Sequence, residues 1–175
     1  LDAEDPWQCL ATCFEIHKAL QSGDPQRYQC QLPVHQDGSC NGLQHYAALG
    51  RDEAGGEQVN LMPRERPGDV YTGIANVLKK IVGEDLVGNE DPAIRKLATH
   101  LAPHIDRKLV KQTVMTSVYG VTHVGARQQI QNRLKERGAV LDENLRYQVA
   151  TYAASRTLDA LSNLFVNARD VMAWL

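Results

Sequence analysis

The first candidate for chemistry is an aspartate that follows a short alternating segment. Asp37 comes shortly after residues 28–35, in which apolar and polar side chains alternate, and it is followed by Gly38. The alternation predicts a strand, whose end would hold the carboxylate rigidly. Glycine lets a ligand approach the backbone, and Mg²⁺ prefers oxygen ligands of this kind. A turn, or an aspartate that caps the following helix, is the alternative reading of the same residues.

The second candidate is a row of side chains within residues 106–121. Arg107, Lys111, Met115 and Tyr119 recur every four residues, so a helix would bring them onto one face. A nucleoside triphosphate along this face would place its phosphates on the two cations and its base and sugar near the last two side chains. A solvated cationic face beside a packed Met and Tyr is the alternative. The opposite face, expected to pack on a core, carries Val110, Val114, Ser117 and Val121.

A third group lies near the N-terminus. Cys9, Cys13 and His17 fall on one face of a predicted helix, a spacing that a metal site could use. Small buried cysteines on the core side of a helix are the more common explanation. The four cysteines form no CxxC pair, so a reducing compartment is the expectation.

Composition narrows the protein class. The 175 residues are 43% hydrophobic and 23% charged with a net charge of −2, which is typical of a globular domain and is not the basic balance of many nucleic-acid-binding domains. No apolar run is long enough to cross a membrane. The acidic start resembles neither a signal peptide nor an Arg-rich presequence, so we expect the chain to begin after any targeting segment or to be part of something longer.

The elements that would position these residues are mostly helices. Residues 28–35 and 58–61 are predicted strands, residues 83–91 a loop, and Ser39 or Asn41 the cap of the second helix. Two short strands and many helices indicate a mainly helical α+β fold. Periodicity, proline and capping signals predict helices over residues 7–21, 40–49, 67–82, 92–101, 106–121, 126–137 and 143–175.

Two long segments resemble a known family. HQDGSCNGLQHYAALGRD, residues 35–52, resembles motif A of the palm in single-subunit, bacteriophage-type DNA-directed RNA polymerases of the mitochondrial branch. RKLVKQTVMTSVYGVT, residues 107–122, resembles the motif B helix of the fingers in the same family. VNL at 59–61 and DVYTGIA at 69–75 match the region between them. The resemblance implies part of a right-hand polymerase, with a partial palm over residues 1–66 and fingers helices over residues 67–175.

The resemblance also implies residue roles. Asp37 resembles the palm aspartate that binds both catalytic Mg²⁺ ions, with the Gly38 carbonyl as a further ligand. Arg107 and Lys111 resemble the residues that hold the incoming triphosphate, and Lys111 would also aid the leaving pyrophosphate. Three further side chains complete the nucleotide site: Met115 would line it, Tyr119 would select ribose over deoxyribose, and Tyr71 would lie nearby.

The family implies partners and a compartment. The partners would be a DNA template, nascent RNA, ribonucleoside triphosphates and, for the full enzyme, mitochondrial transcription factors, with no membrane. The location would be the mitochondrial matrix or, alternatively, the chloroplast. The family's second aspartate lies in a His-Asp hairpin, and no His-Asp pair occurs in these 175 residues. Because a two-metal site needs both carboxylates, we expect the chain alone not to polymerise RNA.

Two other functions fit the same residues. The chain could be a non-catalytic nucleotide- or nucleic-acid-binding module derived from the polymerase, or a helical scaffold within a larger assembly. Magnesium-dependent binding of a triphosphate would favour the polymerase site, whereas salt-sensitive binding of nucleic acid without a triphosphate response would favour the module.

Overall fold

The computed structural model describes residue 3, residues 5–34 and residues 36–174, except for the side chains of residues 168, 169, 172 and 173. The chain divides into two compact units, Leu1–Asp37 and Gly38–Leu175, each of which is described by itself. The predicted boundary between a partial palm (residues 1–66) and fingers helices (residues 67–175) concerns function and stays a prediction.

The first unit contains one long helix, α1 (Pro6–Gln21), whose first position is a proline that cannot donate a backbone hydrogen bond there. Glu15 joins this helix to the segment that follows it. Its carboxylate accepts hydrogen bonds from the Gln31 backbone N–H at 3.1 Å and the Tyr28 hydroxyl at 3.2 Å, and it pairs with Lys18 at 2.9 Å. The backbone hydrogen bond and then the lysine lower the pKa of Glu15 to about 2.

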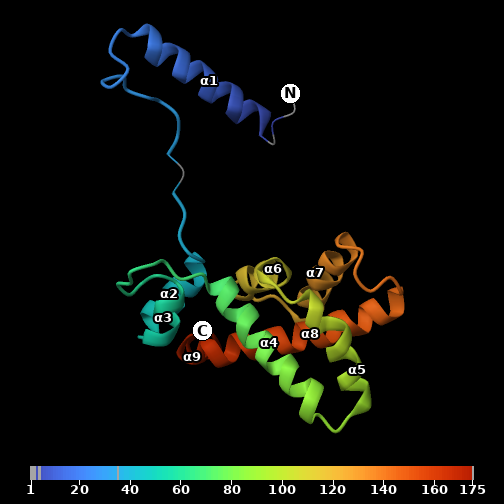
Figure 1. Ribbon diagram of the computed structural model, residues 1–175. Helices are drawn as coiled ribbons and strands as arrows, with labels where there is room; N and C mark the ends of the chain where they lie inside the picture. The colour runs from blue at the N-terminus through green and yellow to red at the C-terminus, as the bar shows by residue number, and fades with distance from the viewer. Residues whose placement is uncertain (1–2, 4, 35, 175) are drawn as a thin grey trace. The chain divides into compact units, whose positions relative to one another are not determined.

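The second unit is built of helices packed around a common core (Figure 1). Its elements in chain order are α2 (Asn41–Leu49), α3 (Glu53–Gln58), α4 (Val70–Gly88), α5 (Pro92–Leu101), the 3-10 turn η1 (Ala102–His104), α6 (Arg107–Ser117), α7 (His123–Glu136), α8 (Glu143–Leu164) and α9 (Val166–Trp174).

Helix α8 is the centre of the second unit, because it contacts α4, α5, α6, α7 and α9. Its buried face carries several small side chains, which let the neighbouring helices approach closely. The partners contribute larger apolar side chains that are fully buried: Ile74, Leu78, Leu101, Leu109, Ile130 and Leu134.

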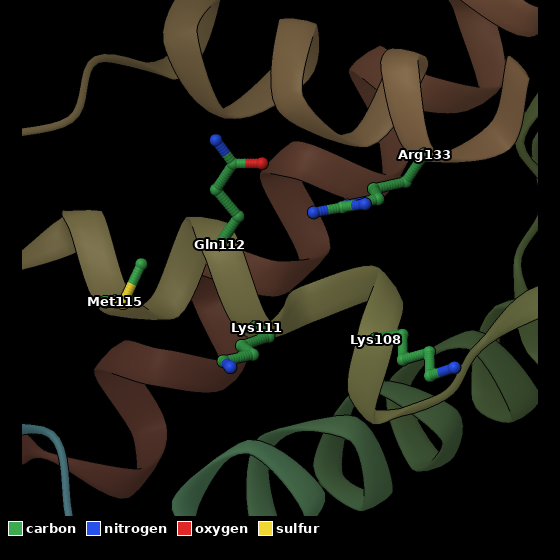
Figure 2. Close-up of a pocket in the computed structure, with 5 residues that line it drawn as sticks. All are labelled: Lys108, Lys111, Gln112, Met115 and Arg133. Carbon is green, nitrogen blue, oxygen red and sulfur yellow. The ribbon is translucent and has the colours of Figure 1, made fainter. Parts of the chain in front are cut away.

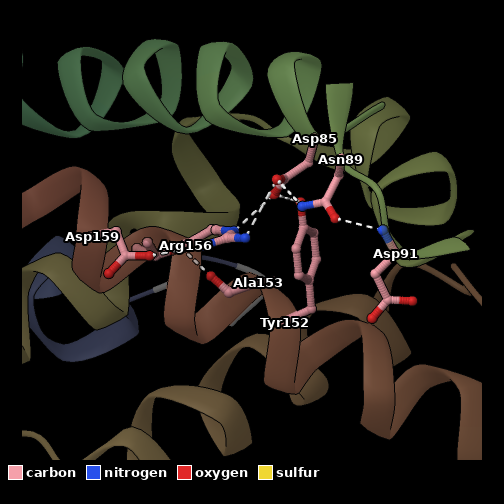
Figure 3. A network of polar contacts seen from close by, with 8 residues as sticks. Asp85, Asn89, Asp91, Tyr152, Ala153, Arg156 and Asp159 are labelled. Carbon is pink, nitrogen blue, oxygen red and sulfur yellow. Dashed lines mark hydrogen bonds and ion pairs between the residues drawn. The ribbon is translucent and has the colours of Figure 1, made fainter. Parts of the chain in front are cut away.

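A polar network joins α4 to α8 (Figure 3). The Asp85 carboxylate accepts hydrogen bonds from the Tyr152 hydroxyl at 2.6 Å, Arg156 Nε at 2.8 Å and Asn89 Nδ2 at 2.8 Å. Burial opposes ionisation of Asp85, but the bonds from Tyr152 and Asn89 and the charge of Arg156 outweigh it, so the pKa of Asp85 lies below its ordinary value. The carboxylate therefore stays charged between the two helices.

The predicted α+β fold is wrong, because no strand occurs in the part of the chain that the structure describes. Residues 28–34 have no regular secondary structure, and His35 lies outside the described residues. Gln58 ends α3, and residues 59–61 form a turn and an irregular segment. Alternation of apolar side chains shows how a segment could bury one face, but a strand also needs a neighbour to bond its N–H and C=O groups. No described segment supplies that neighbour.

Most predicted helices are confirmed, and their ends differ in informative ways. Helices α1 and α5 match closely, whereas α4 continues to Gly88 through the predicted loop. Gly83 disfavours a helix locally, but Val82 is buried and Asp85 bonds to α8, so tertiary packing outweighs propensity. The predicted caps of α2 are wrong, because Cys40 takes that position with a left-handed backbone. Among the described residues, no helix is long and apolar enough to cross a bilayer.

Candidate functional site

The start of α6 is held by a cap and an ion pair. Asp106 precedes the helix, and its carboxylate accepts a hydrogen bond from the Leu109 backbone N–H at 2.8 Å. Arg137, at the end of α7, pairs with the same carboxylate at 2.7 Å and donates to the His104 carbonyl at 3.2 Å. These contacts fix the position of the first turn of α6 and so of the side chains that it presents.

Helix α6 buries one face and exposes the other, as predicted. Arg107, Lys111 and Met115 are exposed, and Met115 keeps 41% of its surface accessible. Met115 is therefore not packed in the core, whereas a solvated cationic face stays an alternative interpretation of Arg107 and Lys111. The buried face of α6 consists of Leu109, Val110, Thr113 and Val114.

Tyr119 does not belong to the helix, which corrects the prediction that the helix continues to Val121. Helix α6 ends at Ser117, and Tyr119 lies in the following turn with 75% of its surface exposed. Its N–H donates to the Thr116 carbonyl at 3.0 Å, and Gly120 adopts a φ of +77°. Glycine takes this left-handed conformation readily and ends the helix. The turn, and not the four-residue repeat of the helix, therefore determines the position of Tyr119.

Arg107 is paired with a carboxylate that sequence reasoning missed. Its Nε lies 2.6 Å from Oδ2 of Asp69, which caps α4 by accepting from the Tyr71 backbone N–H at 3.2 Å. Burial opposes ionisation of Asp69, but hydrogen bonds from Thr72 and Arg107 outweigh it and lower the pKa. The Pro-Gly-Asp sequence before α4 indicates a cap. Only the fold reveals the pairing, because the two residues are far apart in the chain.

Tyr71 lies against both cations, whereas its predicted place beside a bound nucleotide stays a prediction. Its ring centroid is 5.1 Å from Cζ of Arg107 and 6.0 Å from Nζ of Lys111, distances at which a cation is attracted to an aromatic face. Burial and then the neighbouring Cys40 side chain raise the pKa of Tyr71 to about 12. The hydroxyl therefore stays protonated at neutral pH.

The residues after Asp37 lie close to this group. Cys40 influences the Tyr71 hydroxyl, and Asn60 donates to Ser39 Oγ at 2.7 Å. The same Asn60 amide donates to the Gly68 carbonyl at 3.0 Å and accepts from the Gly68 N–H at 2.6 Å. Asn60 thus ties the start of motif A to the start of α4. From the sequence, Asn60 was matched to the family as part of the segment VNL (residues 59–61), and no role was predicted for it.

Helix α2 also approaches the end of α6. A Cβ on Gly42 would overlap the side chain of Val118, so these two segments meet where only glycine fits. The Gly38 carbonyl accepts a hydrogen bond from the Cys40 N–H at 3.0 Å. Asp37 is exposed and is the last residue of the first unit, whereas α6 belongs to the second. The role of Asp37 therefore stays a prediction.

A pocket of about 510 Å³ lies beside α6 on the side of α7 (Figure 2). Lys108, Lys111, Gln112 and Met115 line it from α6, and Arg133 points toward it from α7. Three of these five side chains are cations. Sequence reasoning missed Lys108, Gln112 and Arg133, because α7 meets α6 through a tertiary contact that no local pattern shows.

The third sequence candidate is not supported. Cys9 and Cys13 are exposed free thiols, so they are not the buried core residues expected from their spacing. Within the part of the chain that the structure describes, no group of three or more His, Cys, Asp or Glu side chains could hold a metal ion. Trp7, Leu10, Phe14, Ile16 and Leu20 of α1 are exposed as well.

Known proteins similar to this chain agree on one family. Residues 1–175 match the family model described as DNA-dependent RNA polymerase. The chain is 54% identical over its whole length to "DNA-directed RNA polymerase 1B, mitochondrial" of Nicotiana tabacum, and it is 53% identical over 99% of its length to "DNA-directed RNA polymerase 1, mitochondrial" of Arabidopsis thaliana. It is also 54% identical over its whole length to "DNA-directed RNA polymerase 2B, chloroplastic/mitochondrial" of Nicotiana tabacum.

The chain covers 18% of the first two of these relatives and 17% of the third. It is 53% identical to another relative, "DNA-directed RNA polymerase 2A" of Nicotiana tabacum. That match takes in 98% of this chain and 52% of the relative. A family model that matches every residue and identities above half over the whole chain confirm the family that motifs A and B indicate. This chain belongs to the phage-type family of DNA-dependent RNA polymerases.

Proposed function

We propose that this chain carries the triphosphate-binding part of a DNA-directed RNA polymerase. One observation carries the proposal: α6 presents Arg107, Lys111 and Met115 in order on one exposed face, with the Tyr71 ring beneath both cations. Phosphate oxygens would bind the guanidinium bidentately and the ammonium as a point charge. In nucleotidyl transfer the RNA 3′-hydroxyl attacks the α-phosphate and pyrophosphate leaves, and Lys111 would hold the leaving group.

The base and sugar would lie toward the end of α6. Met115 is exposed beside the cations and offers a flexible apolar surface. Tyr119 is highly exposed in the turn after the helix, and its hydroxyl would contact the ribose. Tyr71, held protonated by burial and by Cys40, would support the cations from below.

Magnesium fits the donors that precede α2. Asp37 offers an exposed carboxylate, and the family resemblance assigns the Gly38 carbonyl as a further ligand. These are the hard oxygen ligands that Mg²⁺ takes, and the ion would neutralise charge on the phosphates. A second carboxylate would come from outside this sequence, so the chain alone is expected to bind nucleotides without polymerising them.

We propose the partners from the family resemblance and the compartment from the names of the relatives. A DNA template and nascent RNA would be the macromolecular partners, with transcription factors serving the complete enzyme. Because the relatives' names place them in mitochondria and, for some, chloroplasts, we propose an organellar location, with the mitochondrial matrix first.

Triphosphate binding by the 175-residue chain tests the proposal. Isothermal titration calorimetry with ATP should show binding that needs Mg²⁺, and Lys111→Ala should weaken it about tenfold, as expected when one charge-assisted contact is lost. Alanine favours helices, so α6 should remain folded. Lys80→Ala, an exposed lysine on α4, should leave the affinity unchanged.

Two results would count against the proposal. Equal loss in Lys111→Ala and Lys80→Ala would mean that binding follows overall charge. Binding of single-stranded RNA or DNA with a steep salt dependence, and no response to ATP, would favour the nucleic-acid-binding module instead.

A further inference from the structure

The pocket between α6 and α7 holds positive charge that the fold does not neutralise. Lys108 and Lys111 form no ion pair with any carboxylate in the described part of the chain. Arg133 pairs with Glu136 of its own helix at 2.8 Å, and the Glu136 side chain is 59% exposed. An exposed pair one turn apart is weak, so the arginine remains available to another anion.

The neighbouring arginines, unlike these lysines, form ion pairs with aspartates. Arg107 is paired with Asp69 at 2.6 Å, and Arg137 is paired with Asp106 at 2.7 Å. Both arginines therefore have partners at the start of α6. Of the α6 cations, Lys108 and Lys111 therefore remain without a carboxylate partner among the described residues, and both line the pocket.

The position of these cations is unfavourable for the helix itself. Lys108 lies in the first turn of α6, where the helix dipole is positive, and the acidic cap Asp106 that precedes this turn is already paired with Arg137. Lys111 follows three residues later, so like charges are neighbours on the helix surface. An anion in the pocket would relieve both repulsions.

We propose that this pocket is a polyphosphate site, in which Lys108 and Arg133 join Lys111 to bind the terminal phosphates of a nucleoside triphosphate or free pyrophosphate. The inference rests on the proposed function and extends it to two residues outside the α6 face described above. Arg133 would grip phosphate oxygens with its planar fork, and the Gln112 amide would donate a further hydrogen bond. The volume of about 510 Å³ lies within the range of small-molecule sites.

The lining favours a polyphosphate over a nucleic-acid strand. Sites for single strands combine a basic groove with aromatic side chains on which bases stack. This pocket is lined by three cations, an amide and a methionine, without an aromatic residue among its described lining. It therefore matches phosphate groups and offers no surface for stacked bases.

Inorganic tripolyphosphate and pyrophosphate are the probes that test the pocket. Calorimetric titration into the 175-residue chain should show binding that Lys108→Gln and Arg133→Gln each weaken about tenfold. Lys135→Gln, an exposed lysine of α7 outside the pocket, is the matched control and should bind as the parent does. Circular dichroism should show that Lys108→Gln unfolds at no lower temperature than the parent, because it removes a cation from the first turn of α6.

The outcomes separate this inference from the proposed function. ATP binding that depends on Lys111 but is unchanged in Lys108→Gln and Arg133→Gln would overturn the pocket and leave the proposed function intact. Polyphosphate binding that depends on both residues, with no binding of ATP, would support the pocket and contradict the proposed function. Absent tripolyphosphate binding, or equal binding of sulfate at the same ionic strength, would overturn the pocket.

Discussion

At the scale of single residues, three aspartates connect the helices of the second unit. Asp69 joins α4 to α6, Asp106 joins α6 to α7, and Asp85 joins α4 to α8, each through an arginine. In all three, burial opposes ionisation, and hydrogen bonds and the arginine charge outweigh it, so each pKa lies below its ordinary value. Ionised carboxylates therefore join α6 to its neighbouring helices and α4 to α8.

These pKa values predict loss of stability in acid. A carboxyl whose pKa is lower in the folded state stabilises the fold above its unfolded pKa, about 3.9, and loses that contribution as pH falls through the folded value. The free energy of unfolding, measured by urea titration, should therefore fall as pH decreases below about 4. Asp85→Asn should cost about 1–3 kcal/mol at pH 7 and reduce the slope.

The control for this experiment lies on the same helix. Glu84 is exposed on α4 and forms no ion pair in the described part, so Glu84→Gln should leave both the stability and its pH dependence unchanged. The range from pH 5 to pH 3 extends about one unit to either side of the ordinary pKa of aspartate. A free energy of unfolding that stays constant over this range would refute the stabilising role of the three carboxylates.

At the scale of elements, the contact between α2 and the end of α6 is the most constrained. Gly42 lies where a Cβ would overlap the Val118 side chain. Val118 is the residue after the last helical position of α6, next to Tyr119. The closeness of this contact therefore helps to set where the chain turns and where the tyrosine is presented.

Substitution of Gly42 tests this contact. Gly42→Ala should destabilise the second unit by about 1–3 kcal/mol, because added volume in a packed contact forces neighbouring atoms to shift. Val118→Ala in the same chain should recover part of that loss. Gly83→Ala is the control: nothing lies within 4 Å of its added Cβ, so it should stabilise α4 by roughly 0.5–1 kcal/mol. Urea midpoints measure all three, and a stabilising Gly42→Ala would contradict the close approach.

At the scale of the whole molecule, the chain consists of two units with separate internal packing. The first is stabilised around Glu15, which bonds to Tyr28 and the Gln31 backbone. The second has its own apolar core around α8. The residues proposed to bind the triphosphate belong to the second unit.

Separate packing predicts independent unfolding. A chain that begins at Gly38 should unfold within about 4 °C of the full chain, because a larger shift would correspond to more than roughly 1 kcal/mol of stabilisation between the units. Glu15→Gln in the full chain should disturb the first unit and leave this transition in place. Thermal melts of both chains can be followed by the circular dichroism of the helices at about 222 nm. A much lower midpoint for the shortened chain would show that the first unit stabilises the second.

The sequence by itself determined most of the helices, the exposed cationic face of α6 and the family. Apolar periodicity identifies helices because burial of one face repeats every turn, and motifs A and B specify the polymerase family. These signals are local, so they needed no fold. The same local signals led to errors at residues 28–34 and 58–61, where apolar side chains alternate but no described segment pairs with the backbone.

Only the tertiary structure decided which residues meet. Asp69 reaches Arg107, Cys40 reaches Tyr71, and Arg133 reaches the pocket beside Lys108 across helices that are distant in sequence. Side-chain spacing within one helix cannot encode such contacts, because they depend on how several helices bury their apolar faces together. The end of α6 and the placement of Tyr119 were decided in the same way, by a glycine turn and by the approach of α2.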